Sequence, residues 1–387
     1  MLGNTFGRMF RVTACGESYG DALVAIIDGC PAGLAISDAE VQVELDRRRP
    51  GTSPLDSPRQ ETDQVHIFAG VRDGVTTGAP LGMIIYNVDR HDIHVKQYFD
   101  AKDLIRPGHA EYTYMIKYGK FADWCGAGRA SGRETCMRVA AGAVAKKILA
   151  QNGIEALGHT CECMGIKARE LGFDEIKAGY RKNLINCADP EAAEKMIARV
   201  LEIKDEGDTA GGKVEVIARG VPAGLGEQVF DKLRATIAHG IMSIGAVTGI
   251  EFGAGFDAAR SLGSEWNDAP YLDEKKRVRF RTNRSGGFLG GISNGEDIVF
   301  RVAVKPTPTI SKPQDSINME TMEEKPLAAI TRRDISICPR IYPVAEAMTN
   351  LAILDALMMT KGLEYFTRIA PKYKEMSKTA WERGEMG

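Results

Sequence analysis

The sequence predicts an α+β fold made of two similar halves, and an internal repeat is the main observation behind this prediction. The segment 26–34, IIDGCPAGL, matches the segment 217–225, IARGVPAGL, 191 positions further along a chain of 387 residues. In both copies an apolar, strand-like run enters a Pro-Ala-Gly turn and a helical pattern follows. Chance similarity in a glycine-rich chain is the alternative. We expect a single domain with halves at about 1–190 and 191–362, followed by a C-terminal tail.

Local signals along the chain indicate the elements in order. Ser37 and Glu40 have the spacing of a capping box and predict a helix that runs towards Arg47. A helix of the second half is expected to begin near Glu227 and to carry apolar residues at four-residue intervals, namely Val229, Leu233 and Ile237. Further helices are predicted over 133–150, from 189 onwards with an apolar face, and over 343–361, and alternating strands over 213–218 and 298–304.

The composition excludes several classes of protein. Lys and Arg number 50 and Asp and Glu 52, so the chain lacks the basic excess of proteins that bind nucleic acid along their whole length. No stretch approaches the roughly 20 apolar residues that cross a bilayer, and residues 1–8 lack the pattern of a secretory signal. Eight scattered cysteines suggest reduced thiols. We therefore expect a cytoplasmic protein with no nucleic-acid or membrane partner.

Two groups of histidine and cysteine were considered as metal ligands. His159, Cys161 and Cys163 alternate and could share one face of a strand, but no second ligand pair follows at the spacing of a zinc site. His91 and His94 likewise lack nearby partners. We expect structural thiols and no metal.

Three loops combine basic residues with glycine in a way that suits anions. Three adjacent arginines, 47–49, precede Pro-Gly-Thr-Ser, and guanidinium groups bind phosphate and carboxylate in bidentate fashion, although cations at a helix end are the simpler reading for Arg47 and Arg49. His109 follows Pro-Gly in a rigid loop, where an imidazole can be aimed. The loop 126–134 contains glycines, Arg129 and Arg133 and leads directly into the N-terminus of a predicted helix. Ser131 and Glu134 have capping-box spacing.

A fourth segment suggests a planar ligand. Paired glycines at 286–287 and 290–291 let a flat ring approach the backbone, and the segment 305–309, KPTPT, follows the next predicted strand. No dinucleotide-binding fingerprint is present. Together the four segments describe a site for a polyanionic substrate and a planar cofactor.

These segments, in this order, resemble the chorismate synthase family from near residue 1 to about Met358. The resemblance rests on Gly16-Glu17-Ser18 and on the ranges 47–51, 106–110, 128–129, 133–135, 138–142, 290–293 and 305–307, followed by Asp334 and the ranges 339–340 and 343–348. It implies a β-α-β sandwich with helices packed between two antiparallel sheets, and a homotetramer.

The resemblance also implies a reaction and a cofactor. Members of the family remove phosphate and a ring hydrogen from 5-enolpyruvylshikimate 3-phosphate to give chorismate, and they need reduced FMN although substrate and product have the same oxidation state. The substrate carries two carboxylates and a phosphate, which arginines suit, and the leaving phosphate needs electrostatic stabilisation. An external flavin reductase or another reductant is expected as a partner.

By position, the resemblance implies roles for individual residues. Arg48, Arg133 and Ser18 bind substrate with help from Arg106. His109 stands beside the pyrimidine edge of the flavin, and Asp334 assists removal of the ring hydrogen. The positions that contact FMN are Arg129, Ala130, Ser131, Gly245, Ala246, Gly290, Lys305, Pro306, Thr307, Pro308, Thr309 and Arg332.

Three residues depart from the family pattern. Tyr19 stands where the family has the histidine that protonates the leaving phosphate, Arg333 stands where a histidine precedes Asp334, and Pro54 replaces an arginine of many relatives. A phenol, with a pKa of ~10, donates a hydrogen bond but cannot become a cation. Loss of a general acid costs ~10²- to 10⁴-fold in rate. We hypothesise that Arg333 supplies a fixed positive charge and Tyr19 only the hydrogen bond.

Two other functions stay open because of these departures. The chain could be a diverged flavin-dependent paralogue that acts on another anionic ring, or a non-catalytic protein that binds flavin or anions. The retained His109, Asp334 and Arg48 favour catalysis, since binding alone does not need an acid-base pair.

Overall fold

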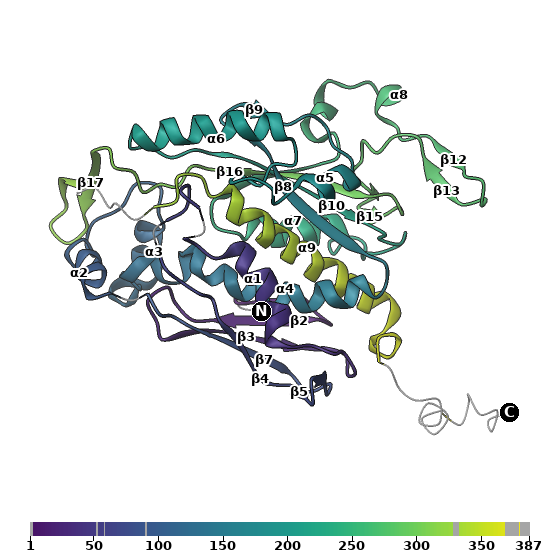
Figure 1. The fold of residues 1–387 in the computed structure, drawn as a ribbon, viewed down its shortest axis with the longest axis horizontal. Helices are drawn as coiled ribbons and strands as arrows, with labels where there is room; N and C mark the ends of the chain where they lie inside the picture. The colour runs from purple at the N-terminus through teal and green to yellow at the C-terminus, as the bar shows by residue number, and fades with distance from the viewer. Residues whose placement is uncertain are drawn as a thin grey trace.

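Two antiparallel sheets of five strands each enclose the long helices of the molecule (Figure 1). The computed structural model describes residues 3–51, 53–57, 59–89, 91–327, 333–367 and 379. In spatial order the first sheet contains β1 (Thr5–Phe6), β2 (Arg11–Cys15), β3 (Ala22–Asp28), β7 (Leu81–Tyr86) and β4 (Val65–Ala69). The second contains β11 (Val247–Phe252), β16 (Ile298–Val304), β10 (Gly212–Arg219), β8 (Glu155–Cys163) and β9 (Ile166–Lys167).

Four helices fill the space between the sheets, namely α1 (Asp38–Arg48), α4 (Thr135–Ala150), α7 (Leu233–Met242) and α9 (Cys338–Lys361). Helix α9 is the centre of the core, with 19 of its 24 residues buried. It crosses α4 so closely that a Cβ on Gly142 would lie 2.4 Å from the Cβ of Ala347, which only glycine permits. The apolar faces of both sheets are thus covered by one shared layer of helices.

Smaller elements lie outside this core. Helix α6 (Pro190–Asp205) covers the outer side of the second sheet together with α5 (Phe173–Gly179) (Figure 1). One end of the molecule carries α2 (Asp92–Asp100), α3 (Glu111–Tyr118), the 3₁₀ turns η1 (Gly119–Phe121), η2 (Cys125–Ala130) and η3 (Gly132–Glu134), and the hairpin β17 (Gln314–Asn318)–β18 (Glu323–Leu327). The remaining elements are β5 (Val71–Arg72), β6 (Val75–Thr76), η4 (Gly255–Arg260), α8 (Gly263–Trp266), β12 (Pro270–Leu272), β13 (Val278–Phe280), β14 (Phe288–Leu289), β15 (Ile292–Ser293) and η5 (Leu363–Tyr365).

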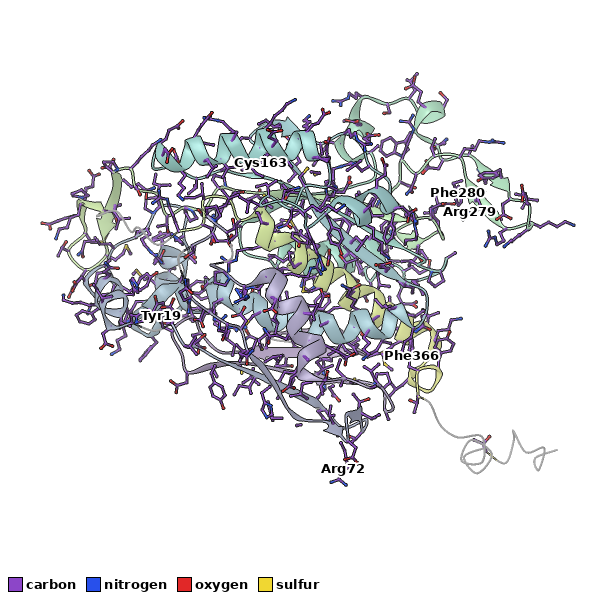
Figure 2. All side chains as sticks on the ribbon, in the orientation of Figure 1. Tyr19, Arg72, Cys163, Arg279, Phe280 and Phe366 are labelled. Carbon is purple, nitrogen blue, oxygen red and sulfur yellow. The ribbon has the colours of Figure 1, made fainter. Side chains whose placement is uncertain are left out.

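An arm extends from the end opposite α2 and α3. It carries the β12–β13 hairpin, where Figure 2 labels Arg279 and Phe280. Leu272 and Val278 on this arm are 65% and 60% exposed, so its apolar side chains are not covered by the rest of the chain.

The repeat has the same local geometry in both halves. Gly29 follows β3 and Gly220 follows β10, with φ of 84° and 83°, and a Cβ on either would lie within 2.1 Å of a backbone oxygen at the start of the neighbouring strand. After each turn a helix of the inner layer begins, α1 in the first half and α7 in the second.

A buried hydroxyl clamps each Pro-Ala-Gly turn in the same way. In the first half Thr76 Oγ1 donates to the Pro31 carbonyl at 2.6 Å and accepts from the Leu34 amide at 2.9 Å. In the second half Ser293 Oγ donates to Pro222 at 2.6 Å and accepts from Leu225 at 2.8 Å. The two hydroxyls come from parts of the sequence that show no similarity, so the structure extends the repeat beyond the nine matched residues.

Most element predictions agree with the structure, but some helix starts and one capping interaction differ. Ser37 and Glu40 form the capping box of α1, Asp189 caps α6, and the strand at 298–304 is correct. Helix α7 begins at Leu233 and not near Glu227, because Val229 is 66% exposed and belongs to a loop. Helix α9 begins five residues before Pro343, with Pro339 in its first turn. Ser131 accepts from the Arg133 amide, so no capping box forms with Glu134.

Candidate active site

A cavity of ≈ 170 Å³ opens at the end of the molecule that carries α2 and α3. The loop between β2 and β3, the end of α1, the turns η2 and η3 and the first turns of α9 meet there, and Tyr19 marks the place in Figure 2. Its polar lining comes from several separate segments and includes Ser18, Tyr19, Arg48, Arg59, Arg133, Asp334 and Arg340.

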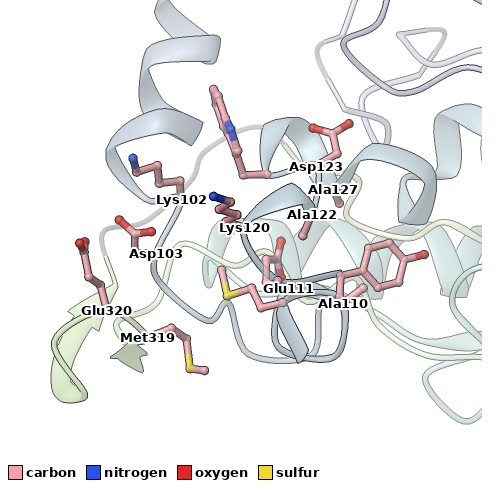
Figure 3. A pocket seen from close by; sticks show the side chains of 14 residues that line it. Lys102, Asp103, Ala110, Glu111, Lys120, Ala122, Asp123, Ala127, Met319 and Glu320 are labelled. Atoms are coloured by element: carbon pink, nitrogen blue, oxygen red, sulfur yellow. The ribbon is translucent and has the colours of Figure 1, made fainter. Parts of the chain in front are cut away.

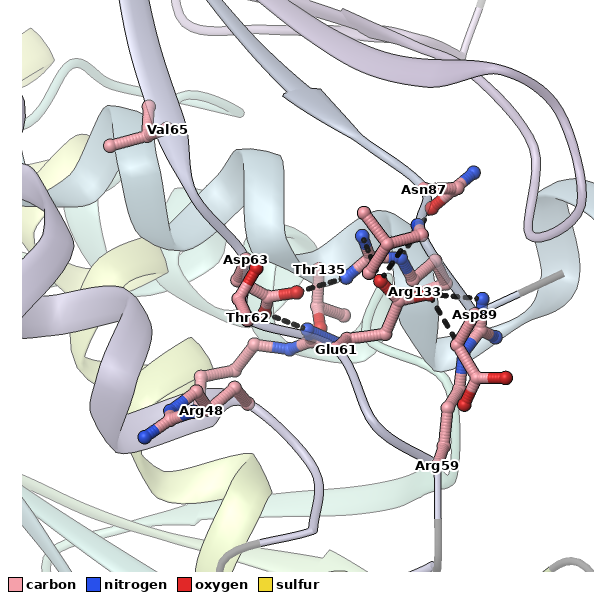
Figure 4. Close-up of polar contacts among 12 residues, drawn as sticks. Arg48, Arg59, Glu61, Thr62, Asp63, Val65, Asn87, Asp89, Arg133 and Thr135 are labelled. Carbon is pink, nitrogen blue, oxygen red and sulfur yellow. Dashed lines mark hydrogen bonds and ion pairs between the residues drawn. The ribbon is translucent and has the colours of Figure 1, made fainter.

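Arg48 is fixed in the cavity wall by three protein acceptors. Its Nη1 donates to Asp63 at 2.7 Å, its Nε to the Thr135 hydroxyl at 3.1 Å and its Nη2 to the Gly132 carbonyl at 3.0 Å (Figure 4). The side chain is 1% exposed, and burial lowers the pKa of Arg48. Three of the five N–H groups of this guanidinium are thereby used, which orients the plane of the group.

Arg133 shares the carboxylate of Asp63 with Arg48. It donates to the other oxygen of Asp63 and, through Nε, to Asn87 at 2.7 Å, and its Nη2 lies 3.5 Å from Glu61 (Figure 4). Although burial alone raises the pKa of Asp63, the two arginines hold it at about 2. Asp63 is therefore an anion throughout the physiological range and keeps both guanidinium groups in place.

Arg59 and Arg340 complete the ring of cations. Arg59 donates to Ser18 and to Glu61, the latter at 2.8 Å. Arg340 Nη1 contacts both oxygens of Asp334, at 2.7 and 2.8 Å, and the amide of Ser57 donates to the same carboxylate at 2.9 Å. Burial opposes the charge of Arg340, but Asp334 raises its pKa above the ordinary value.

The cavity is surrounded by pre-oriented guanidinium groups. The carboxylates of Glu61, Asp63 and Asp334 hold four of them, namely Arg48, Arg59, Arg133 and Arg340, and Asp56 also acts on the charge of Arg340. Guanidinium groups fixed in this way suit a ligand with several anionic oxygens.

His109 lies in the turn that precedes α3 and contacts the 305–309 segment. Its Nε2 is 2.9 Å from Thr309 Oγ1, and Lys305 Nζ donates to the Gly108 carbonyl at 2.8 Å. Gly108 has φ of 73°, and a Cβ there would approach Pro308 to 2.8 Å. Burial, with Arg106 and Lys305 nearby, lowers the pKa of His109 to about 3, so the imidazole is neutral near pH 7.

The backbone joins most of the expected cofactor positions into one surface. A Cβ on Gly245 would lie 3.9 Å from the Ala130 carbonyl, and Ala246, with φ of 71°, accepts from the Lys305 amide at 2.9 Å. Thr307 donates to the backbone carbonyl of Asp334 at 2.6 Å. Ser131 and Gly245 line the cavity directly.

Several expected site residues lie elsewhere or have other partners. Arg129 donates to the carbonyls of Gly16 and Ala14 and so ties η2 to β2. Arg106 pairs with Glu111 at 2.8 Å and lies over the ring of Tyr98.

Gly290 is exposed at the tip of the β14–β15 hairpin, which contacts the N-terminal end of α7, whereas Gly245 follows the C-terminal end of this helix. Gly286, Gly287 and Gly291 accommodate neighbouring chain and side chains, not an open face. Arg332 lies outside the described residues, as does the tail beyond Thr367 except Thr379.

The three residues that depart from the family pattern do not share one site. Tyr19 lines the cavity, but Arg333 donates to Ser311 and is not among the lining residues. Pro54 accepts from Lys204 of α6 at 3.1 Å and is also outside the lining.

Sequence reasoning missed three residues of the site, Glu61, Asp63 and Tyr98, and gave no role to Arg340 of the matched range 339–340. The alternation of Arg59, Glu61 and Asp63 was a usable signal, because charged residues at every second position suggest an extended segment with one charged face. Tyr98 offered none, since an aromatic residue in a short helix usually belongs to a core.

A larger cavity of ≈ 530 Å³ is lined by residues of α3 (Figure 3). Its walls mix acidic and basic side chains with Tyr114, Trp124 and Met319. Glu111 lines this cavity and bonds to Arg106, which connects it with Tyr98 of the smaller one. Its lining charges come from lysine, aspartate and glutamate, not from the fixed guanidinium groups that mark the first site.

The histidine and cysteine cluster has structural partners. His159 Nδ1 accepts from the Ala188 amide at 3.3 Å, and Cys161 and Cys163 contact backbone carbonyls. Within the described ranges no three His, Cys, Asp or Glu side chains gather in a way that could hold a metal ion. In the same part of the chain no helix has the length and apolar character to span a bilayer.

Comparison with known proteins gives one consistent result. The family model described as chorismate synthase matches residues 10–358. A chorismate synthase of Acetivibrio thermocellus is 58% identical over 379 residues, covering 94% of this chain and 96% of its own. One of Methanosarcina mazei is 50% identical over 358 residues, covering 92% and 97%. A crystal structure of chorismate synthase superimposes with a TM-score of 0.75 and 30% identity, over 93% of this chain and 96% of the other.

Proposed function

The chain belongs to the chorismate synthase family, and on this premise we propose that the arginine-lined cavity is where it converts 5-enolpyruvylshikimate 3-phosphate to chorismate. As a member of the family it is a carbon–oxygen lyase of chorismate biosynthesis in the shikimate pathway. One observation carries the proposal of the site: buried carboxylates hold four guanidinium groups around a single cavity. A substrate with two carboxylates and a phosphate supplies the anionic oxygens that fixed guanidinium groups bind.

Arg48, Arg133 and Ser18 bind the substrate in this proposal, and Arg106 assists from beyond Tyr98. Arg48 and Arg133 are already oriented by Asp63, so they lose little conformational entropy when an anion binds. Arg133 Nη2 makes no hydrogen bond among the described residues, and a ligand oxygen would satisfy it.

Asp334 receives the ring hydrogen as a proton. Arg340 and the Ser57 amide hold its carboxylate in one orientation, and a fixed base reacts more readily than a mobile one. The C–O bond to phosphate breaks, and its electron pair leaves with the phosphate. The surrounding cations stabilise the charge that develops on the departing oxygen.

The family uses a flavin, and we infer that reduced FMN binds along Ala130, Ser131, Gly245, Ala246 and Lys305–Thr309. These residues fit the group, because they present backbone close to the cavity, hydroxyls and the ammonium of Lys305, which suit an electron-rich ring and a phosphate. When bound, reduced FMN lends electron density to the substrate ring. Because the imidazole of His109 is neutral, it would offer the flavin ring a hydrogen bond without adding a charge.

Three further proposals concern the whole protein. The matching turns and hydroxyl clamps support a duplicated β-α-β sandwich folded as one domain. The exposed apolar arm and the position of Gly290, at the end of α7 away from Gly245, support a homotetramer whose flavin site is completed by another copy. We also propose a cytoplasmic location and an external reductant for the flavin.

Formation of chorismate under anaerobic conditions tests the function. Mixing the protein with photoreduced FMN and 5-enolpyruvylshikimate 3-phosphate is expected to give chorismate absorbance and free phosphate, and Asp334→Asn is expected to lower kcat by at least ~10²-fold. Arg72→Gln, on an exposed hairpin, is the control and should match the unaltered protein.

The alternatives give different results in the same assay. A diverged paralogue would yield no chorismate from this substrate yet release phosphate from another anionic ring. A binding protein would show flavin-dependent ligand binding without any product, and either outcome would refute the proposal.

A further inference from the structure

The ring of Tyr19 is enclosed on three sides at the cavity wall. The guanidinium carbon of Arg59 lies 5.4 Å from the ring centroid, and the ring of Tyr98 meets it edge-on, also at 5.4 Å between centroids. A Cβ on Gly126, which has φ of 60°, would lie 2.5 Å from two carbons of the Tyr19 ring. The glycine of η2 thus provides a flat surface on which the phenol lies.

Arg59 is held in place independently of Tyr19. Its Nη1 and Nη2 donate to the hydroxyl and carbonyl of Ser18, both at 3.0 Å, and Nε donates to Glu61 at 3.1 Å. The side chain of Arg59 is 13% exposed and that of Glu61 is fully buried. A guanidinium does not lose its proton in proteins, so a permanent cation stands beside position 19.

Arg333 has other contacts. It donates to Ser311, and its charge assists Lys312 in lowering the pKa of Asp208. The hypothesis that Arg333 compensates for the missing imidazole therefore finds no contact to support it, whereas Arg59 touches both the residue before Tyr19 and the Tyr19 ring.

We propose that Arg59 is a positioning residue for Tyr19 and supplies the permanent positive charge that a protonated imidazole supplies at this position elsewhere in the family. The proposal rests on the proposed function. When the C–O bond breaks and its electron pair leaves with the phosphate, the Tyr19 hydroxyl donates a hydrogen bond to the departing oxygen. Arg59 balances the new negative charge without giving up a proton, and the ring hydrogen leaves as a proton towards Asp334.

Several other charged groups lie near Tyr19. Glu17 and Asp21 flank it in the same loop, and Glu61 pairs with Arg59 while Arg133 lies 3.5 Å from the same carboxylate. Beyond Tyr98, Arg106 is paired with Glu111. Cys125, near Arg59, stays a neutral thiol because burial raises its pKa to about 11, while Asp123 bonds to the Cys125 amide and adds one negative charge. Arg59 is the charged group in direct contact with the ring.

The pKa of a histidine introduced at position 19 would report the electrostatic effect of Arg59. In Tyr19→His protein free of flavin and substrate, NMR titration of the added imidazole, the seventh of the chain, is expected to give a pKa below its ordinary value of ~6.5, because a neighbouring cation disfavours protonation. Adding Arg59→Met should raise that pKa by about one unit or more, and adding Arg333→Met should leave it unchanged.

The titration tests the proposal even if the double variant does not fold. If Arg59→Met prevents folding because Glu61 loses its partner, the value in Tyr19→His alone still decides: a pKa at or above ~6.5 overturns the proposal. An equal effect of Arg333→Met would overturn it as well. Since no turnover is involved, a protein that failed to make chorismate would refute the proposed function and leave this result standing.

Turnover gives a second reading in the reduced-FMN assay. The unaltered enzyme should show no loss of kcat/KM that depends on position 19, whereas Tyr19→His should acquire a loss as pH rises through the lowered pKa that the titration gives for its imidazole. Arg59→Met should lower kcat by about 10²- to 10³-fold, with Arg59→Lys intermediate and Arg333→Met within about twofold of the unaltered enzyme. A fall in thermal stability with unchanged kcat would identify Arg59 as structural only.

Discussion

Asp63 shows how an anion site can be prepared inside a folded core. A buried arginine without a partner is costly, and a buried ion pair keeps its charge only when its hydrogen bonds are satisfied. Here one carboxylate serves Arg48 and Arg133, so two guanidinium groups share one negative charge and the pair keeps a net positive charge. The acid therefore fixes the cations in position while leaving an attraction for substrate.

The neutral imidazole of His109 makes a stability prediction at the residue scale. Its pKa is about 3 in the folded protein and ~6.5 in an unfolded chain, so between these values only the unfolded chain binds the proton. The stability due to this group is complete above ~6.5 and is lost as pH falls, by about 2 kcal/mol at pH ~5. His109→Gln should remove that part of the difference between urea unfolding curves at pH ~7 and ~5.

The exposed histidine His66 provides the comparison for this measurement, since it is 65% exposed. His66→Gln should retain the pH dependence of the unaltered protein. If His109→Gln and His66→Gln showed the same loss of stability between the two pH values, burial of His109 would not be the cause.

The site was partly predictable from sequence, and the reason is chemical. Arg48, Ser18 and Asp334 belong to motifs with recognisable neighbours, and the structure brings them to one cavity. The alternation at positions 59, 61 and 63 indicates an extended segment with one charged face, but it does not show which arginines Glu61 and Asp63 contact, because an acidic residue in a polar loop usually faces solvent. Which charges face one another depends on contacts between segments far apart in the chain.

At the scale of the element, predicted helix starts were correct where residues close together in the sequence determine them. The capping box of α1 and the proline after Asp189 define helix starts within four residues of sequence. The predicted start of α7 was wrong. Val229 has the spacing of a residue on the apolar face of a helix, but its side chain is exposed in the structure. Periodicity alone does not distinguish an apolar loop residue from the first turn of a helix.

The two hydroxyl clamps predict equal effects of equivalent substitutions. Thr76→Val and Ser293→Ala each leave a buried carbonyl and a buried amide without a partner, so each should lower the free energy of unfolding by about 1–3 kcal/mol. Because the clamps lie in different sheets, the double variant should show the sum, measured by urea unfolding with unchanged slope.

Thr77→Val is the matched control, because Thr77 is exposed and its hydroxyl bond to Gly70 is 3.3 Å long. It should change stability by less than ~0.5 kcal/mol. A large effect in one half and none in the other would show that the two turns, although alike in geometry, do not contribute alike.

At the scale of the molecule, the expected flavin contacts do not all lie on one face of one chain. Ser131 and Gly245 line the cavity beyond the C-terminal end of α7, whereas the β14–β15 hairpin that carries Gly290 contacts the N-terminal end of this helix. A rigid fold of two sheets around shared helices cannot bring these ends together. If Gly290 contacts flavin, it does so in the site of another copy.

Subunit complementation tests this arrangement. Gly290→Asp adds a carboxylate that repels an electron-rich flavin, and aspartate tolerates the positive φ of 59° better than most residues. Alone, Gly290→Asp and Asp334→Asn should each be nearly inactive. Co-expressed in equal amounts with different tags and purified together, they should recover about a quarter of the normal activity, because one site in four combines an intact Asp334 with an intact Gly290 from its neighbour.

The uncharged variant Gly290→Asn separates charge from backbone strain, since it has nearly the same size as the aspartate variant and should keep most of the activity. If each site were built within one chain, every site of the mixed oligomer would carry one of the two defects and no activity would return. Recovery near a quarter would instead mean that the cavity of one subunit and the β14–β15 hairpin of another form a single flavin site, so that the protein is active only as an assembly.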